Sequence, residues 1–210
     1  TRELDAFARA STLANSLNVE ATLQGAVDMI TGLLNPHACL LYLAAKDHAD
    51  LYVSHAYFDP EQYSPDATAK IGAARIPWGA GLIGSSAESQ RPLLSLDATK
   101  DPRAKMIPGA PLKPVTYIVV PMTFGEETLG VLRVSRYGVG QYGADDLTLA
   151  SIFANQAAVA IANARMFEQT NEAERAARES EAHYERLTSN AGEVIMRIER
   201  ADCRATYLNA

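Results

Sequence analysis

The chain has 210 residues, of which 48% are hydrophobic and 21% are charged, and its formal net charge is −6. This composition is typical of a folded globular protein and not of a disordered or fibrous one. An acidic chain without a basic cluster argues against a nucleic-acid-binding surface, because contacts to phosphates depend on clustered Lys and Arg.

The apolar stretches of the chain also restrict its location. The longest of them, such as Val115 to Met122, are shorter than the roughly 18 to 20 residues that a membrane-spanning helix needs. The N-terminus shows no signal-peptide pattern. We therefore expect a cytoplasmic protein with no membrane contact by this segment. The cysteines, Cys39 and Cys203, belong to no Cys-x-x-Cys or Cys/His cluster, so no structural metal site is expected.

The first third of the chain changes from helical to strand periodicity. Apolar residues recur at helical spacing over residues 3–17 and again over 18–34, which predicts two helices, with Asn18 as the N-cap of the second. Two strands are predicted next, over 37–45 and 51–58, with a polar turn between them. Residues 59–114 are rich in Pro and Gly, which predicts loops with short elements. An irregular stretch of that length in a compact domain usually has a function.

The second half of the chain contains the clearest hairpin and a long helix. The predicted strands 115–124 and 128–137 are apolar on both alternating faces, so both faces must be covered, one by helices and the other by the Pro/Gly-rich segment. This arrangement leaves room for a pocket under the loops. No Pro or Gly occurs from Ala144 to Ser189, which predicts one helix of about 45 residues.

This order of elements resembles the GAF family, and several local strings agree with it. They are the glycines 79, 81 and 84, the stretch 91–97 with 101–103, the hairpin strings 119–122 and 129–132, and the helical string 145–164. The resemblance covers about residues 1–167. It implies an α+β fold in which a GAF-like antiparallel sheet has helices on one face and a loop-covered pocket on the other, with a long C-terminal helix in addition.

The C-terminal residues resemble a different family. The stretches 186–198 and 207–210 are similar to the opening of a PAS domain. We therefore expect a GAF-like sensor domain over 1–167, whose last helix starts near 144, a signalling helix over 168–189, and the truncated start of a PAS domain over 190–210. The resemblance implies a place in a bacterial multidomain sensor, such as a sensor histidine kinase.

Polar and aromatic groups in the loop region, and on the strands that face it, form the mixture expected of a small-molecule site. Four of them have a structural alternative. Asp97 and Arg103 can cap loops, and Trp78 and Tyr57 can belong to the core. His55 is the histidine most suited to face the pocket, where it would be a candidate haem ligand. The seven candidates for ligand binding are Tyr57, Arg75, Trp78, Asp97, Arg103, Thr116 and Tyr117.

The sequence gives little support for catalysis. Gly79, Gly81 and Gly84 match the dinucleotide-binding pattern G-x-G-x-x-G, but Pro77 interrupts the preceding segment and the predicted helix 82–90 is too short for a normal crossover. The alternative to a dinucleotide site is that these glycines only allow the chain to turn. GAF-type methionine-sulfoxide reductases use cysteines in the pocket, and the loops of this chain contain none. The motifs of the cyclic-nucleotide-binding GAF domains are altered in this sequence, which argues against a cyclic-nucleotide ligand. We expect no catalytic residue, no cofactor and no metal.

The long helix contains a heptad seam, whose positions alternate spacings of three and four. The seam residues are Leu149, Ile152, Gln156, Val159, Asn163, Met166, Thr170, Ala173, Ala177, Ser180, Tyr184 and Leu187. This seam predicts a homodimer through helices 3–17 and 144–189, whereas the alternative is a solvated single helix supported by pairs such as Glu174 and Arg178. The function expected is a regulatory module that senses a small cytoplasmic ligand and signals through the dimeric helix to a PAS domain and an output domain. The alternative function is a ligand-free structural dimerisation module.

Overall fold

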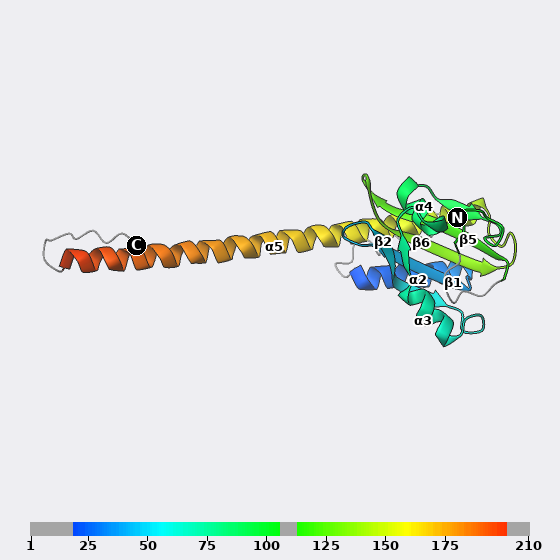
Figure 1. Cartoon of the computed structure of the whole chain (residues 1–210), viewed down its shortest axis with the longest axis horizontal. Helices are drawn as coiled ribbons and strands as arrows, with labels where there is room; N and C mark the ends of the chain where they lie inside the picture. The colour runs from blue at the N-terminus through cyan, green and yellow to red at the C-terminus, as the bar shows by residue number, and fades with distance from the viewer. Residues whose placement is uncertain (1–18, 106–112, 201–210) are drawn as a thin grey trace. The chain divides into compact units, whose positions relative to one another are not determined.

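The computed structural model describes residues 19–105 and 113–200, apart from the side chains of residues 168 and 187–200 (Figure 1). Residues up to 164 belong to one compact unit, and the helical residues from 165 belong to another. The helices are α2 (Val19–Leu34), α3 (Pro65–Ala73), α4 (Gly81–Ser89) and α5 (Ala144–Arg200). The predicted helix 3–17 and its neighbour Asn18 lie outside the described residues.

Six strands form one antiparallel sheet in the order β3-β2-β1-β6-β5-β4. The long central strands agree with the predicted ones to within one residue at each end, because their apolar runs are bounded by turns. One such turn is at Gly125, whose φ of +60° is readily adopted only by glycine. The strands are β1 (Ala38–Ala44), β2 (Asp50–Phe58), β3 (Arg75–Pro77), β4 (Leu93–Ser95), β5 (Val115–Phe124) and β6 (Glu127–Tyr137).

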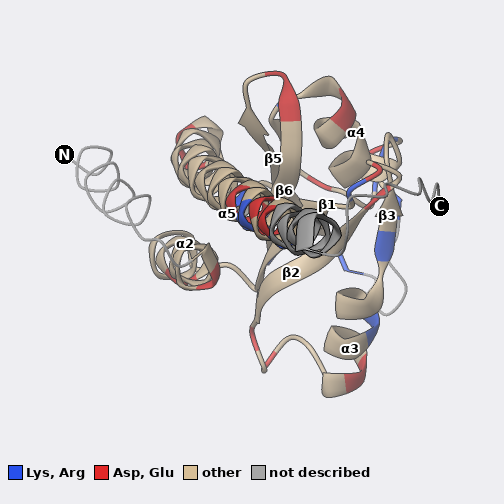
Figure 2. Ribbon diagram, turned by 90° about the vertical axis from the view of Figure 1, so that its left-hand side faces the viewer, with Lys and Arg blue, Asp and Glu red and all other residues tan. Residues whose placement is uncertain are grey.

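Both faces of the sheet are covered, as the apolar alternation of β5 and β6 requires. Figure 2 shows α2 and the first part of α5 on one side of the sheet and α3 and α4 on the other. Val27 of α2 and Phe153 of α5 belong to the core on the first face, which we call the helix-side core. Ile71 of α3 and Leu82 of α4 belong to the core on the second face, which we call the loop-side core.

Helix α5 continues beyond its predicted end at Ser189 and reaches Arg200. Residues 190–200, which the sequence assigned to the start of a PAS domain, are helical in this structure. Gly192 is the one Gly or Pro in that stretch, and a glycine inside a helix costs only about 1 kcal/mol relative to alanine, which is too little to end it. Residues 201–210 lie outside the described part of the chain, and no PAS fold is described.

Among the described residues, α5 is the one helix that is long and apolar enough to cross a membrane by length and composition alone. Its most apolar window has a mean hydropathy of 1.3, and 44% of that window is buried inside the protein. The buried side chains include Ala150, Phe153 and Ala157 of the helix-side core. The apolar character of this window is therefore explained by packing on the sheet.

The junction between β3 and α4 is held by close backbone packing. Gly79 and Gly81 have φ values of +73° and +64°, so both need the conformational freedom of glycine. A Cβ atom on Gly84 would collide with the carbonyl oxygen of Pro77 and would lie 3.0 Å from the amide nitrogen of Gly79. Gly79 thus lies in the turn after the three-residue strand β3, and Gly81 and Gly84 lie in the first turn of the nine-residue helix α4, without the long parallel strand of a dinucleotide-binding fold.

This packing predicts that Gly84→Ala lowers the free energy of unfolding by about 1–3 kcal/mol, because the added methyl group overpacks the turn. Gly72→Ala is the matched control, since nothing lies within 4 Å of a Cβ at that helical position. There the substitution should be neutral or stabilising by up to about 1 kcal/mol. Urea unfolding of the two variants measures the difference. Equal stabilities would show that the turn at Gly84 relaxes without cost.

Candidate ligand cavity

A cavity of about 190 Å³ lies on the loop side of the sheet, between β3, α4 and β5. Its volume is below the roughly 300–1,000 Å³ of sites for drug-sized ligands, so it suits a small metabolite. Most of the wall is apolar, with two cationic residues and one phenol. The lining residues are Ala74, Arg75, Ile76, Pro77, Ala80, Gly81, Leu82, Ile83, Ala104, Lys105 and Tyr117.

Tyr117 connects this cavity to a buried positive charge. The tyrosine lines the cavity, and its ring centroid lies 5.2 Å from Cζ of Arg133 on β6. Arg133 is only 2% exposed, and its Nε makes no hydrogen bond. No carboxylate of the described residues lies within ion-pair distance of it. A buried charge without a partner is rare in folded proteins, because desolvation disfavours it strongly.

A second buried polar group lies near Arg133. Tyr42 of β1 is fully buried in the loop-side core, and its hydroxyl has no hydrogen-bond partner. Burial raises the pKa of the Tyr42 phenol, and the charge of Arg133 opposes this effect only in part. The phenol is therefore neutral at physiological pH and keeps its proton for donation.

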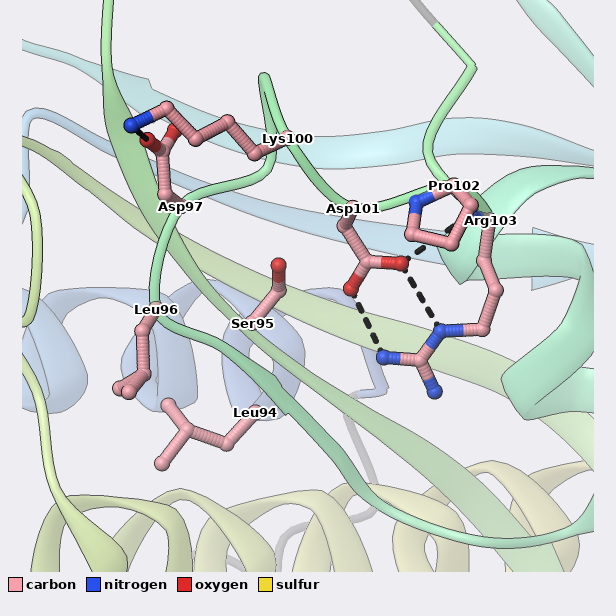
Figure 3. Close-up of a pocket in the computed structure, with 8 residues that line it drawn as sticks. All are labelled: Leu94, Ser95, Leu96, Asp97, Lys100, Asp101, Pro102 and Arg103. Atoms are coloured by element: carbon pink, nitrogen blue, oxygen red, sulfur yellow. Dashed lines mark hydrogen bonds and ion pairs between the residues drawn. The ribbon is translucent and has the colours of Figure 1, made fainter.

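A larger hollow, of about 420 Å³ and open to solvent, lies beside β4 and the loop that follows it (Figure 3). Its charged groups are paired with one another. The Arg103 guanidinium donates to both Asp101 oxygens, at 2.9 and 2.7 Å, and holds the pKa of that carboxyl well below its usual range. Asp97 accepts a 2.6 Å hydrogen bond from the Thr99 hydroxyl and lies 3.7 Å from the Lys100 ammonium. These contacts organise the loop and leave few groups for a ligand.

The seven predicted ligand residues do not lie together: two line the smaller cavity, two line the open hollow and three line neither. Arg75 and Tyr117 line the smaller cavity, although Arg75 also forms a 3.0 Å ion pair with Asp50. Asp97 and Arg103 lie in the open hollow, where each has an intramolecular partner.

The other three predicted residues line neither cavity. Trp78 packs edge-on against His48, at 5.2 Å between ring centroids. Tyr57 packs against the helix-side core, on the face opposite the cavity. Thr116 is fully buried, with its hydroxyl within 3.0 Å of the carbonyl oxygens of Leu96 and Gly138, so it fixes a loop.

His55 does not face the pocket, contrary to the sequence-based expectation. It is buried against α2, with Nε2 3.2 Å from a Glu20 carboxylate oxygen and Nδ1 2.9 Å from the Ser54 hydroxyl. Cys39 lies in the helix-side core, where burial raises the pKa of its thiol to about 12, so it is not a reactive thiolate. Within the described part of the chain, no group of three or more His, Cys, Asp or Glu side chains could hold a metal ion.

Sequence reasoning missed Arg133, Tyr42 and Lys105. One signal was available, because Arg133 interrupts an apolar strand that was predicted to be covered on both faces. A charge at such a position is either paired or functional.

A family model described as GAF domain matches residues 16–162. The chain belongs to the GAF domain family. GAF domains are regulatory, signal-sensing modules, and the mixed fold with its six-stranded antiparallel sheet is the GAF-like one that the sequence predicted. The regulatory assignment agrees with the expectation that this segment is not catalytic.

Solved structures support the GAF fold. The GAF domain of a phosphoenolpyruvate-protein phosphotransferase from Coxiella burnetii has 20% identity and a TM-score of 0.66, over 80% of this chain and 96% of that one. The free methionine-R-sulfoxide reductase of Neisseria meningitidis, solved with its substrate, has 17% identity and a TM-score of 0.62, over 75% and 86%. A methyl-accepting chemotaxis protein fragment has 17% identity and a TM-score of 0.60, over 75% and 97%. At these identities the similarity establishes the fold alone.

Proposed function

We propose that this GAF domain senses a small cytoplasmic ligand in the cavity between β3, α4 and β5. The observation that supports this most directly is the cavity itself, whose wall is mostly apolar but includes Arg75, Lys105 and Tyr117. That combination is what small-molecule sites use, since apolar contacts give affinity and polar groups give orientation.

Strand β5 offers a direct physical route from the cavity to α5. Its side chains alternate, so that Tyr117 lines the cavity while Ile118 and Val120 belong to the helix-side core. Phe153 of α5 is buried in that same core. A ligand that displaces β5 would therefore change the packing of α5, and close-packed cores transmit such shifts.

The output in this proposal is a dimeric helix. The stripe of α5 that is buried on the sheet includes Ala150, Phe153, Ala157 and Ile161, and the first two seam residues, Leu149 and Ile152, are partly buried against the same core. Seam residues further along the helix are exposed, as Met166 is at 57%. A second copy of the chain is the proposed partner on this seam, with helix 3–17 as a second contact, and a PAS domain and a histidine kinase are the proposed downstream parts.

A ligand-free dimerisation module is the competing function, and thermal denaturation distinguishes the two. A ligand at about 100 times its Kd stabilises the folded state by about 2.7 kcal/mol, which corresponds to a rise in Tm of about 5 °C or more for a chain of this length. We expect at least one compound in a panel of small metabolites to produce such a shift.

Two variants show whether the shift comes from this cavity. Ala104→Leu fills it and should abolish the shift, whereas Ala69→Leu, on the exposed surface of α3, should leave the shift intact. If no compound stabilises the wild-type chain while the chain still dimerises, the structural function is correct and the sensory one is wrong.

A further inference from the structure

Arg133 is a buried cation that has no anionic partner among the residues that the structure describes. It lies on β6 in the interior of the sheet, where it is opposite Leu40 of β1 and Val119 of β5. Both of these neighbours belong to the loop-side core, so the side chain extends to the face that holds the cavity. An arginine remains protonated in proteins, so burial does not remove its charge.

The groups around Arg133 offset this charge only in part. The ring of Tyr117 gives a cation–π contact, which is weaker than a carboxylate partner. Tyr42 has a hydroxyl without a partner in the same core, and that hydroxyl is a second donor rather than a counter-charge. Lys105, at the cavity wall, adds a further positive charge and has no ion pair with a described carboxylate. Lys105 and Tyr117 line the cavity, and Arg133 contacts that wall through the Tyr117 ring, so these groups together favour an anion.

The donor set points to one kind of anion. A guanidinium presents parallel N–H groups that match the two oxygens of a carboxylate, and a neutral phenol supplies one more hydrogen bond. The rest of the cavity wall is apolar and small, which favours a short hydrocarbon body over a highly charged group such as a phosphate.

We infer that the ligand of this GAF domain is a small organic monocarboxylate whose anion pairs with Arg133 and Tyr42 while its body occupies the cavity beside Tyr117. This inference rests on the proposed sensory function. It names the ligand class and assigns a binding role to two residues that the sequence did not single out.

Thermal denaturation of the whole chain with matched probes tests the inference. The probes are acetate, propionate, butyrate and benzoate, their neutral primary amides, and methyl phosphate, each at 10 mM and constant ionic strength. We expect at least one carboxylate to raise the Tm, its amide to have no effect, and methyl phosphate to have less effect than the carboxylate.

Variants assign the effect to the buried arginine. Arg133→Met should weaken binding of the active carboxylate at least about 30-fold, because a buried charge pair loses one partner. Tyr42→Phe should weaken it less. Arg136→Met, on the same strand, should bind as the wild type does. Arg133→Met should also fold with equal or higher Tm without ligand, since an apolar residue replaces an unpaired buried charge.

The outcomes separate this inference from the proposed function. If an amide stabilises the wild type and Arg133→Met equally, the cavity binds a ligand but the anion inference is wrong. If methyl phosphate exceeds every carboxylate, the ligand class is wrong. If no carboxylate stabilises the chain more than its amide does, the inference also fails, and the broader metabolite panel alone then decides the sensory function. Should Arg133→Met fail to fold, Arg133→Gln and the amide comparison on wild-type protein replace it.

Discussion

Replacing Phe153 with alanine should lower the free energy of unfolding by about 3–5 kcal/mol. Phe153 is 1% exposed in the helix-side core, where Leu41 of β1 and Leu132 of β6 belong to the same cluster. The substitution removes a large apolar side chain and leaves a cavity that a close-packed core fills only in part. Urea unfolding followed by the fluorescence of Trp78, the single tryptophan of the chain, measures the loss.

Phe167→Ala is the matched control, because this second phenylalanine of α5 is 58% exposed. Its loss should change the free energy of unfolding by no more than about 0.5 kcal/mol. A loss at Phe153 as small as the one expected at Phe167 would mean that the first part of α5 contributes little to the stability of the domain. The proposed route from β5 to α5 would then be wrong, since it requires α5 to be part of the core that β5 also enters.

Strand β5 and the start of helix α5 were predictable because a Pro or Gly residue bounds the apolar periodicity of each one. Strand β5 was expected over 115–124 and has those bounds, since Pro114 precedes it and Gly125 turns the chain after it. Helix α5 was expected from Ala144, directly after Gly143, and begins there. The predicted C-terminal end at Ser189 was wrong because it was set by the end of the stretch without Pro or Gly, and Gly192 does not end the helix, which reaches Arg200.

The candidate site was less predictable, because strands covered on both faces give no polar side from which to assign direction. Tyr57 and Thr116 were expected to face the pocket, yet both lie on the helix-side face. The register of strand pairing decides on which face of the sheet a side chain lies, and a shift of one residue exchanges the two faces. The bulge between Leu41 and Tyr42, where β1 pairs with β2, is such a shift, and nothing in the local sequence signals it.

The pairing of Arg133 with Tyr117 was also inaccessible from the sequence. The two residues are on neighbouring strands, but Tyr117 is opposite Ser135 and Arg133 is opposite Val119, so the contact is diagonal across the hairpin. Predicting it requires the exact register of β5 and β6 and the side-chain direction of each strand. The hairpin was predicted correctly, whereas its diagonal contacts depend on three-dimensional detail.

Replacing Ala177 with leucine should raise the association constant of the chain about 10- to 100-fold, if the heptad seam of α5 forms a parallel dimer. Ala177 occupies a seam position, and leucine there would bury several more methyl and methylene groups against the partner helix, at about 0.8 kcal/mol each when fully buried. Sedimentation equilibrium over a range of chain concentrations measures the association constant directly.

Ala182→Leu is the matched control, because Ala182 is an exposed alanine of the same helix on the side opposite the seam. The two variants make the same change in helix propensity and in surface hydrophobicity, so a difference between them reports the seam alone. Equal effects would point to nonspecific association, and a monomer in both cases would leave α5 as a solvated helix with i,i+4 pairs such as Arg175 and Glu179. Stronger association of Ala177→Leu than of Ala182→Leu would mean that the wild-type seam is weak because its residues are small. In a weak seam, a few kcal/mol from a ligand bound to the sensor domain are enough to change how the two helices pack.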